Sequence, residues 1–530
     1  MSLLKAPLPA LASGLLFAGA FPPFNQWWLA WLWALPLLHV TWSQSERRGW
    51  RQFFFGFRHG WMAGCAIFIG TLWWLAHVTL PGMIALCFYL ACYPALWSGF
   101  AAMLKPRGPG HGLLAAVALA MLWTGLEWVR ASVPVMGFPW NGAAVPLADM
   151  TGLRSLAKYA GAIGLSALPL FFMCGVAASW SLRRHRSVRG RAILMAVSMA
   201  TPAVLTLITW QKSPQPTAQV QVMLVQPNVP MDVKMNLHLR DLPPEQQREI
   251  IEKHRLRRYA ELETLTLSGL GSARTKPGLI VWPESALPNL FHDPFHKEWF
   301  ARLFEAGAEL ILTGCDALTA EDSESENWNQ HNCAALMQDS WENFLLHAKV
   351  RLVPFGEYIP LRRQLPFLEE MLGDLIPSDF SAGYSLEPLQ LEGMTFEIIP
   401  LVCFEDTIPD LARKFVRRAP QLLVNITNDN WFHQSNESAI HALNARWRCL
   451  ELQRPMVRAA NTGLTCVIDT EGRITDEFPR WKQGVLHASV PLVREEITFY
   501  ADHGDVVPLG AGIAGLILTF ALLCCNRSQA

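Results

Sequence analysis

The chain is 530 residues long, which exceeds the size of one ordinary domain and leaves room for two or three. Lys plus Arg and Asp plus Glu both number 44, so the formal net charge of zero gives no indication of a nucleic-acid partner or an acidic substrate. Only 17% of the residues are charged and 51% are hydrophobic, whereas soluble domains average about 25% charged residues. This composition argues against a wholly water-soluble protein and predicts that a large part of the chain faces lipid.

Residues 1–212 form a series of apolar segments, several of which reach the ~20 residues needed to cross hydrocarbon. The first segment is short, but it lacks a small-residue cleavage site and continues through Pro22-Pro23 into the second, which favours a membrane hairpin over a signal peptide. We therefore predict a transmembrane domain of seven helices over 1–212. The seven predicted spans are Leu8–Phe21, Gln26–Trp42, Phe53–His77, Met83–Leu104, Leu113–Ala131, Ala157–Leu182 and Ala192–Thr209.

Residues 218–495 have the composition of a soluble α/β domain, in which short apolar runs alternate with amphipathic stretches. Gln246–Leu267 is predicted to be a helix, and residues 506–526 hold a last apolar segment that brings the total to about eight transmembrane helices. The predicted strands are Val220–Val225, Gly278–Trp282, Leu310–Thr313, Phe396–Cys403 and Leu422–Asn425.

The positions of Lys and Arg between the apolar segments predict the orientation in the membrane, because cytoplasmic loops are enriched in these residues. The basic residues fall mainly in alternate loops, whereas Arg130, Arg154 and Lys158 are a minority at the other ends of spans. The domain at 218–495 follows the seventh span, so we expect it outside the cytoplasm. The loops taken as cytoplasmic carry Lys5, Arg47, Arg48, Arg51, Lys105, Arg107, Arg183, Arg184, Arg186, Arg189, Arg191 and Arg527.

The polar middle of the chain carries an odd number of cysteines, none of them in a CxxC pair. We therefore predict at least one free thiol and no disulfide framework. No zinc-ligand spacing appears either, and the sequence requires no metal or cofactor. These five cysteines are Cys315, Cys333, Cys403, Cys449 and Cys466.

The first segment that could carry chemistry is Leu279–Ala286, in which an apolar run delivers Glu284 directly after Trp282-Pro283. Apolar surroundings raise the pKa of a carboxyl group, which suits a general base or acid. Taken alone, the segment is equally compatible with an acidic residue that complements a helix N-terminus.

The second segment places Lys349 and Glu357 on either side of a Val-Pro-Phe-Gly turn. The lysine could stabilise an oxyanion, and the carboxylate could hold the lysine in place. As isolated features, a solvated lysine and a surface ion pair are the simpler interpretation.

The third segment ends an apolar run at Cys403 and continues with Phe404, Glu405 and Asp406. A cysteine at such a position could lie at a nucleophile elbow, where a nearby base or cation would be needed to form the thiolate. A lone cysteine in an apolar run is more commonly buried and inert.

Taken together, the three segments resemble the nitrilase superfamily, an αββα sandwich with a Glu-Lys-Cys triad. Val281–Ser285, Lys349–Tyr358 and Val402–Asp406 match the corresponding family segments in order, and Asn425–Phe432 is similar to the next strand and turn lining the pocket. The resemblance implies that Glu284 is the general base, Lys349 the oxyanion-stabilising cation and Cys403 the nucleophile. It gives Glu357, Phe404 and Glu405 supporting roles.

The membrane segments extend the resemblance to the bacterial apolipoprotein N-acyltransferases, over nearly the whole chain. That family transfers an acyl chain from a membrane phospholipid to the α-amino group of the N-terminal S-diacylglyceryl cysteine of apolipoproteins. The resemblance implies a ping-pong reaction through a thioacyl-enzyme on Cys403, without a cofactor, in the bacterial cytoplasmic (inner) membrane with the catalytic domain facing the periplasm. The matching segments outside the triad are Phe21–Phe24, Glu127–Arg130, Gly137–Trp140, Val225–Pro230, Thr498–Tyr500 and Gly504-Asp505.

Three positions depart from the family pattern. Met235 stands where the family often has tryptophan, His433 stands where glycine is usual, and Phe404 replaces a frequent tyrosine. These departures concern the substrate-facing loops. Glu127 and Arg130, at the end of a predicted span, are expected to pair structurally, with a role at a phospholipid headgroup as the alternative.

Two other functions share some of these features. A membrane-anchored amidase or hydrolase of the nitrilase superfamily would have the same triad, but would need neither eight spans nor two lipid substrates. A non-catalytic membrane scaffold or transport component would keep the fold without acylation of Cys403.

Overall fold

The computed structural model describes residues 7–528 except 44–48, 134, 151, 210–214, 230–241, 288–294, 321–327, 363, 365, 367–369, 371–378 and 494–496. The chain divides into two compact units. The first unit comprises Met1–Lys212, Ser435–Leu452 and Thr498–Ala530, and the second comprises Ser213–Gln434 and Gln453–Ile497. Met235 lies outside the described residues.

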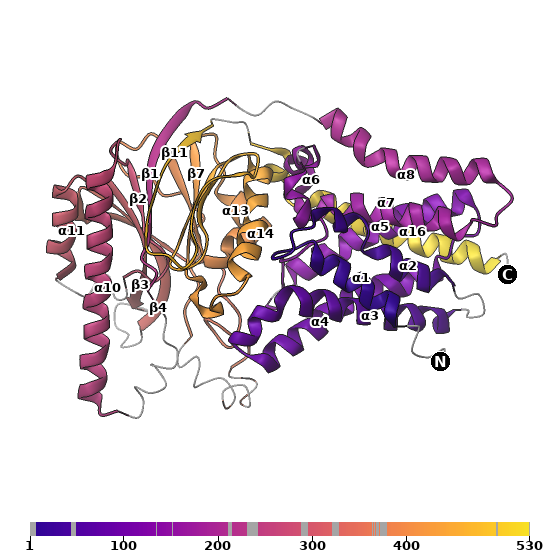
Figure 1. Cartoon of the computed structure of the whole chain (residues 1–530), viewed down its shortest axis with the longest axis horizontal. Coiled ribbons are helices and arrows are strands. Elements are labelled where there is room, and N and C mark those ends of the chain that lie inside the picture. Colours follow the sequence, from indigo (N-terminus) through magenta and orange to yellow (C-terminus); the bar gives the residue numbers. More distant parts are fainter. Residues whose placement is uncertain are drawn as a thin grey trace. The chain divides into compact units, whose positions relative to one another are not determined.

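The first unit is helical, and Figure 1 shows its long helices running roughly side by side. Four helical segments, Leu80–Met103, Pro109–Ser132, Val188–Ile208 and Val506–Cys525, are long and apolar enough to cross a membrane. The number becomes five if the bent pair of α6 and α7 counts as one span. The helices of this unit are α1 (Leu8–Gly19), α2 (Ala34–Ser43), α3 (Trp50–Leu72), α4 (Leu80–Met103), α5 (Pro109–Ser132), α6 (Ala157–Leu165), α7 (Ala167–Ser181), α8 (Val188–Thr209), α14 (Glu437–Leu452), α15 (Phe499–His503) and α16 (Val506–Ser528).

The other predicted spans have a more broken structure than the sequence suggested. Leu8–Phe21 contains the 12-residue helix α1, and Gln26–Trp42 is divided into the 3-10 helix Trp27–Trp31 and the 10-residue α2. The predicted span Ala157–Leu182 is bent by 63° between α6 and α7. Within α6, Gly161 has a φ of 65°, a left-handed conformation that interrupts a regular helix and that glycine adopts without steric cost.

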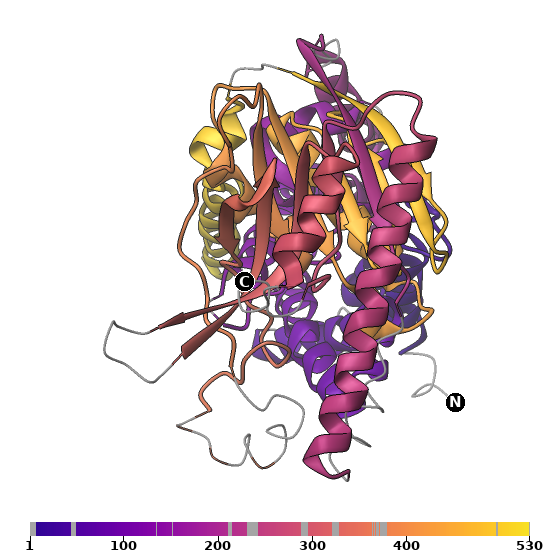
Figure 2. The ribbon, with the colours of Figure 1, turned by 90° about the vertical axis from the view of Figure 1, so that its left-hand side faces the viewer.

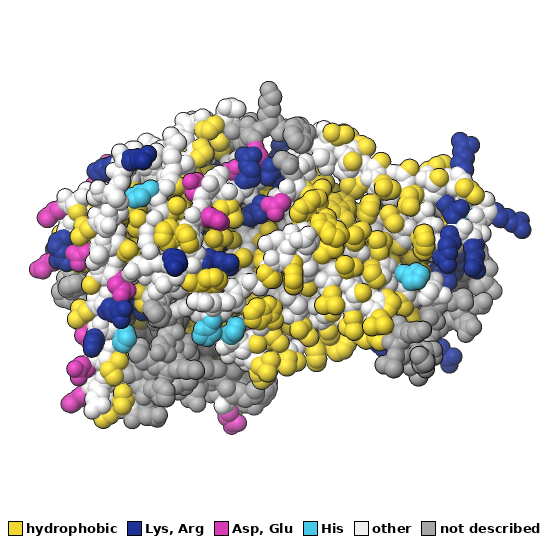
Figure 3. Space-filling view, viewed as in Figure 1, with side chains coloured by type: hydrophobic (Ala, Val, Ile, Leu, Met, Phe, Trp, Pro, Cys, Tyr) yellow, Lys and Arg dark blue, Asp and Glu magenta, His cyan; other side chains and the backbone are white. Residues whose placement is uncertain are grey.

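Close packing of α3 against α4 depends on three glycines spaced one helical turn apart. A methyl group on Gly56, Gly60 or Gly64 would clash with the α4 backbone, at Ser98, Pro94 and Ala91 respectively. Small residues at this spacing let two helices approach closely, as membrane helices commonly do. Figure 3 shows hydrophobic side chains covering most of the visible face of this unit, with Lys and Arg side chains gathered at the end where α16 finishes.

Glu127 and Arg130 are buried at the end of α5 and bind the backbone of the segment that follows. Glu127 Oε1 accepts the N–H of Ala143 at 2.7 Å, and Arg130 Nη1 donates to the carbonyl oxygen of Trp140 at 2.7 Å. Asn444 of α14 joins the same segment, because its Oδ1 accepts the N–H of Asn141 at 3.0 Å. Both charged residues thus hold backbone groups, and the ion pairs of the described residues do not include the expected Glu127–Arg130 pair.

The second unit contains two β-sheets that pack face to face (Figures 1 and 2). The six-stranded sheet has the order β11-β1-β2-β3-β4-β5, and the five-stranded sheet has the order β10-β9-β8-β7-β6. The strands are β1 (Ala218–Gln226), β2 (Leu279–Val281), β3 (Leu310–Ala320), β4 (Trp328–Gln338), β5 (Ser340–Ala348), β6 (Glu397–Val402), β7 (Gln421–Thr427), β8 (Met456–Ala460), β9 (Thr465–Ile468), β10 (Ile474–Phe478) and β11 (Gly484–Leu492).

Alternating side chains divide the core of this unit into two layers. Leu224, Val281 and Leu312 point toward the second sheet, where they meet residues such as Val402 and Ile426. Their sequence neighbours on the same strands pack on the opposite face beneath the helices α10 (Pro244–Ser272) and α11 (Phe295–Glu305). This alternation is the period-2 pattern of strands whose two faces are both covered.

The five predicted strands and the predicted helix are present, at β1, β2, β3, β6, β7 and α10. Parallel pairings join β2 to β3 in the first sheet and join β6, β7 and β8 in the second. In each sheet, the carboxyl ends of these strands therefore lie at the same end. Glu284 follows the carboxyl end of β2, and Cys403 follows that of β6. These strand ends therefore position the candidate site.

Candidate active site

Glu284 lies on a turn directly after β2, and no helix begins at this position. Wholly buried Trp282 anchors the strand end through a hydrogen bond from its Nε1 to Thr266 Oγ1 at 3.1 Å. A side chain at Gly314 on the neighbouring strand would collide with the Glu284 backbone, so the close approach there requires glycine. The interpretation of Glu284 as an acid at a helix N-terminus is therefore wrong.

The Glu284 carboxylate is only 8% exposed and both of its oxygens are held. Oε1 accepts a hydrogen bond from Asn332 Nδ2 at 2.8 Å, and Oε2 accepts the N–H of Asn428 at 2.9 Å. Burial raises the pKa of Glu284 above its ordinary value, Glu357 adds to the rise, and Lys349 opposes it. The carboxylate is thus fixed in direction and a better proton acceptor than an exposed glutamate.

Lys349 follows β5 and is 1% exposed, so it is not the solvated lysine considered from the sequence. Its Nζ lies 2.8 Å from Glu357 Oε1 and 3.8 Å from Glu284 Oε1. Burial lowers the pKa of Lys349, but the neighbouring acidic groups outweigh it and raise the pKa above its ordinary value. Lys349 is therefore a permanent cation inside the site.

Cys403 is the first residue after β6 and has a φ of 57°. A left-handed conformation is strained for a residue with a side chain, and such strain collects at functional sites. Asn425 Nδ2 holds the turn by donating to the carbonyl oxygens of Leu401 at 3.1 Å and Cys403 at 2.8 Å. This is the sharp turn expected of a nucleophile elbow.

The Cys403 side chain is half-buried and lies close enough to Glu284 and Lys349 for both to influence its ionisation. Thr427 Oγ1 lies 3.7 Å from the sulfur. Burial raises the pKa of Cys403 well above its ordinary value, Glu284 adds to the rise, and Lys349 opposes it. The resting thiol is therefore protonated, and a base must remove its proton before the sulfur can attack.

Glu357, Glu405 and Phe404 surround these three residues. Glu357 Oε1 accepts from Lys349 Nζ and from Asn332 Nδ2 at 2.9 Å, and its Oε2 accepts the N–H of Val353 at 2.8 Å. The Phe404 ring centroid lies 5.3 Å from Lys349 Nζ, within the range of a cation–π contact.

Glu405 is fully buried and organises the backbone beneath the elbow. Its Oε1 accepts the N–H groups of Val350 at 2.8 Å and Arg351 at 2.9 Å, and its Oε2 accepts that of Val402 at 2.8 Å. Burial raises the pKa of Glu405 to about 7, despite these donors and the nearby Lys349. The residue ties the segment after Lys349 to the segment before Cys403.

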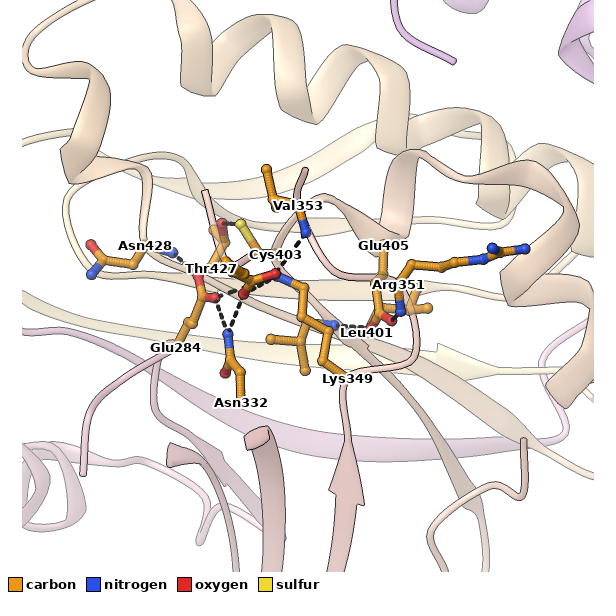
Figure 4. Close-up of polar contacts among 12 residues, drawn as sticks. Glu284, Asn332, Lys349, Arg351, Val353, Leu401, Cys403, Glu405, Thr427 and Asn428 are labelled. Atoms are coloured by element: carbon orange, nitrogen blue, oxygen red, sulfur yellow. Dashed lines mark hydrogen bonds and ion pairs between the residues drawn. The ribbon is translucent and has the colours of Figure 1, made fainter. Parts of the chain in front are cut away.

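Figure 4 shows that the side chains of Glu284, Lys349 and Cys403 converge, although they come from separate strands. Asn332 on β4 lies between Glu284 and Glu357, and the sequence analysis did not identify it. β4 follows an acidic stretch of the sequence, and the apolar run Cys333–Met337 was the available signal for a strand. Asn425 and Asn428 fall in the segment that was expected to line the pocket.

His433 has a φ of 50° and a ψ of −158°, a conformation that is essentially restricted to glycine. This explains why glycine is usual at the position and shows that the departure from the family pattern places a strained residue there. The strain lies in the turn that follows the 3-10 helix Asp429–Phe432.

The arrangement can perform nucleophilic acyl chemistry. A thiol converges with a buried carboxylate of raised pKa (Figure 4), and a buried ammonium group lies 3.8 Å from that carboxylate. Proton transfer from sulfur to carboxylate would create a thiolate, and the ammonium could stabilise negative charge on a carbonyl oxygen that the sulfur attacks.

Two family models match separate parts of the chain. The family model described as apolipoprotein N-acyltransferase N-terminal domain matches residues 13–176, and the carbon-nitrogen hydrolase model matches residues 253–497. The crystal structure of a carbon-nitrogen hydrolase from Helicobacter pylori G27 aligns with 52% of this chain and 89% of that chain, at 12% identity and a TM-score of 0.34.

Curated relatives match over nearly the full length. The apolipoprotein N-acyltransferase of Geobacter metallireducens is 32% identical, with 97% of this chain and 94% of the relative covered. The apolipoprotein N-acyltransferase of Azotobacter vinelandii is also 32% identical, again with 97% and 94% covered. The chain therefore belongs to the apolipoprotein N-acyltransferase family and is an N-acyltransferase enzyme with a carbon-nitrogen hydrolase domain.

Proposed function

We propose that this protein transfers a fatty acyl chain from a membrane phospholipid to the α-amino group of the N-terminal S-diacylglyceryl cysteine of apolipoproteins. The reaction proceeds in two half-reactions through a thioacyl-enzyme on Cys403. The observation that carries the proposal is the convergence of the Cys403 thiol, the buried Glu284 carboxylate and the Lys349 cation (Figure 4), in a chain of this family.

In the first half-reaction, Glu284 accepts the thiol proton and the thiolate attacks the ester carbonyl carbon of the phospholipid. The new C–S bond produces a tetrahedral oxyanion, whose charge Lys349 stabilises. The ester C–O bond then breaks, Glu284 returns its proton to the leaving oxygen, and lysophospholipid departs. The acyl chain remains as a thioester on Cys403.

In the second half-reaction, the free amine of the apolipoprotein attacks the thioester carbonyl carbon. A C–N bond forms, the C–S bond breaks, and Glu284 conveys a proton from the amine nitrogen to the departing sulfur. The products are an N-acylated apolipoprotein and the regenerated thiol, so no cofactor is consumed. Asn332 and Glu357 keep Glu284 and Lys349 in position during both steps.

The protein is proposed to be an inner-membrane enzyme with eight transmembrane helices, seven within 1–212 and one within 506–526. The catalytic domain at 218–495 is then periplasmic, because the basic loops favour the cytoplasmic side. Reporter fusions at Arg186 and at Asp476 test this topology. A cytoplasmic signal at Arg186 and a periplasmic signal at Asp476 are expected, and the reverse pattern would refute it.

The function is tested by incubating the purified enzyme with a phospholipid and a diacylated lipopeptide that has a free N-terminus. The expected product is the N-acyl lipopeptide together with one equivalent of lysophospholipid, and Cys403→Ala should form neither. If the wild-type enzyme instead hydrolyses small amides and never yields N-acyl product, the protein is a nitrilase-type amidase. If wild type and Cys403→Ala behave alike in cells and in vitro, the scaffold interpretation replaces the enzymatic one.

A further inference from the structure

The proposed second half-reaction leaves one proton without an acceptor, and this inference rests on that proposed function. The α-amino group of a peptide has an ordinary pKa of about 8, so the acceptor arrives at neutral pH mainly as an ammonium ion. An ammonium group carries three N–H protons and the amide product carries one. Glu284 conveys one proton to the sulfur, so a second base must take the other before the nitrogen can attack.

Asp316 lies on the face of the sheet that carries the candidate site. On β3, Leu310 and Leu312 point into the core between the sheets, and the period of two places Asp316 on that same face. In the antiparallel pairing of β3 with β4, Asp316 stands directly opposite Asn332. Side chains opposite each other in such a pair are about 5 Å apart at Cβ, and Asn332 itself donates to Glu284 and Glu357.

Asp316 lies on the part of β3 that continues beyond the end of β2. β2 ends at Val281, where it pairs with Leu312, whereas β3 continues to Ala320. Figure 2 shows β3 and β4 extending together beyond the neighbouring strands. Asp316 is partly exposed, while Glu284 is 8% and Lys349 1% exposed. Its carboxylate is therefore more accessible to an incoming polar group than the Glu284 carboxylate.

The Asp316 carboxylate has little to bind within the described part of the chain. Its recorded hydrogen bond is a long one, 3.4 Å from Gln330 Nε2 to Oδ2. Arg258, the nearest cation on α10, instead donates through Nη1 to the carbonyl oxygen of Ser285 at 3.1 Å. Asn332 Oδ1, on the residue opposite, is buried and has no hydrogen-bond donor among the described residues. The two acceptors leave room for a donor that none of the described residues supplies.

The surroundings of Asp316 favour a bound cation. They also make its carboxylate a base of intermediate strength. Burial raises the pKa of Asp316 to about 6, and the charges of Glu284 and Glu357 add to the rise while Gln330 and Arg258 oppose it. At neutral pH the carboxylate is mainly ionised, so it can receive an ammonium ion. Its raised pKa makes it a stronger base than an ordinary aspartate.

The other acidic groups of the site are already committed. Glu357 holds Lys349, Asn332 and the N–H of Val353 through its two oxygens. Glu405 is fully buried and binds three backbone N–H groups. Asp316 differs from both, because its carboxylate accepts a single long hydrogen bond among the described residues.

We propose that Asp316 binds the ammonium group of the apolipoprotein acceptor and accepts its first proton. An N–H bond breaks and an O–H bond forms on Asp316, which leaves a neutral amine beside the thioester. The amine then attacks as described, and Asp316 later releases its proton to solvent. Asp316 is thus a catalytic residue of the second half-reaction only.

The test separates the two half-reactions with the full-length enzyme in detergent. Acyl-enzyme is formed from phospholipid alone and quantified by intact mass, and it is then discharged by the diacylated lipopeptide at neutral pH. Asp316→Asn should acylate normally but discharge to the lipopeptide about tenfold more slowly, because about a tenth of an amine with a pKa of about 8 is neutral at pH 7. Hydroxylamine, which is largely uncharged at neutral pH, should discharge the variant at the wild-type rate.

Raising the pH supplies a second signature. At roughly pH 9 the acceptor is mostly neutral, so the defect of Asp316→Asn should shrink toward the wild-type rate. Asp316→Glu, which keeps the carboxylate, should retain most of the lipopeptide reaction. Glu342→Gln is the matched control, because this carboxylate lies on the same sheet with its side chain 71% exposed.

Two results would overturn the assignment of Asp316. One is a loss of acylation or of hydroxylamine discharge equal to the loss with lipopeptide, which would indicate a general structural defect. The other is a defect that stays constant between neutral pH and roughly pH 9. A wild-type enzyme that forms no acyl-enzyme would instead refute the proposed function.

Discussion

Lys349 illustrates how burial changes the meaning of a single residue. In the sequence it is one lysine before an apolar segment, but in the fold it is a buried cation between two carboxylates. An isolated buried ammonium would be too costly to remain charged, and Glu357 offsets that cost at 2.8 Å. The pair keeps a positive charge where an oxyanion would form.

Replacing Lys349 with methionine should therefore slow formation of the acyl-enzyme by about 10²–10³-fold, the effect of losing an oxyanion-stabilising donor. Single-turnover acylation with phospholipid, followed by intact mass, measures this rate. Lys276→Met is the matched control, because Lys276 is 56% exposed and pairs with Glu309 on the surface. A Lys349→Met rate within tenfold of wild type would contradict the role.

The pH dependence of acylation should report Glu284. The general base must be ionised to accept the thiol proton, and burial raises the Glu284 pKa. Activity is therefore lost as the pH falls, and the ascending limb of kcat/KM should lie above the ordinary glutamate pKa of about 4.3. An acylation rate that is already maximal near the ordinary value would show that Glu284 is not the base.

At the scale of elements, the elbow after β6 depends on its neighbour β7. Asn425 supplies both hydrogen bonds that hold the carbonyl oxygens of Leu401 and Cys403, and these bonds compensate for the left-handed conformation of Cys403. Cys403 is therefore positioned by a residue of the neighbouring strand that takes no part in the proposed chemistry.

Asn425→Ala should lower the free energy of unfolding by about 1–3 kcal/mol, because two buried carbonyl groups lose their donor. Acylation should slow more than the loss of folded protein explains. Thermal unfolding and single-turnover acylation measure the two effects, with Gln221→Ala, at an exposed hydrogen bond to Ser489, as the control. Acylation unchanged in folded Asn425→Ala would contradict the positioning role.

The contact between α3 and α4 gives a prediction for the helical unit. Gly60→Ala should lower the melting temperature in detergent, because the added methyl group meets the Pro94 carbonyl and the Ser98 side chain. Gly110→Ala, where nothing lies within 4 Å of the added methyl group, should be neutral or stabilising because alanine favours helix by about 1 kcal/mol. Equal changes in melting temperature at the two positions would show that close packing of α3 against α4 does not limit the stability of the helical unit.

At the scale of the whole molecule, local pattern predicted the parallel strands that carry the site. Apolar runs such as Ile399–Val402 mark strands that are covered on both faces, and the polar residue after each run marks its end. The apolar runs before Glu284 and Cys403 correctly predicted that both residues follow the end of a strand. It could not show that they meet, because that depends on the pairing of two sheets across a shared core.

The sequence pattern predicted the structure less well where an element depends on its contacts with other elements. β4 and β5 carry polar residues such as Asn332 and His347 among their inward positions, so the alternation that marks a strand is blurred, and Asn332 was missed. In the helical unit, hydropathy marked an apolar run at Ala157–Leu182 but not its 63° bend. The bend follows from local backbone geometry and packing, which average hydropathy does not contain.

The central claim is that Cys403 carries the acyl group between two lipid substrates. Its most direct test is the intact mass of the purified enzyme after incubation with phospholipid alone. The account predicts a mass gain of one acyl chain that maps to Cys403, disappears with hydroxylamine and is absent in Cys403→Ala. An unmodified wild-type enzyme that still delivers N-acyl product, or an adduct that persists in Cys403→Ala, would contradict it.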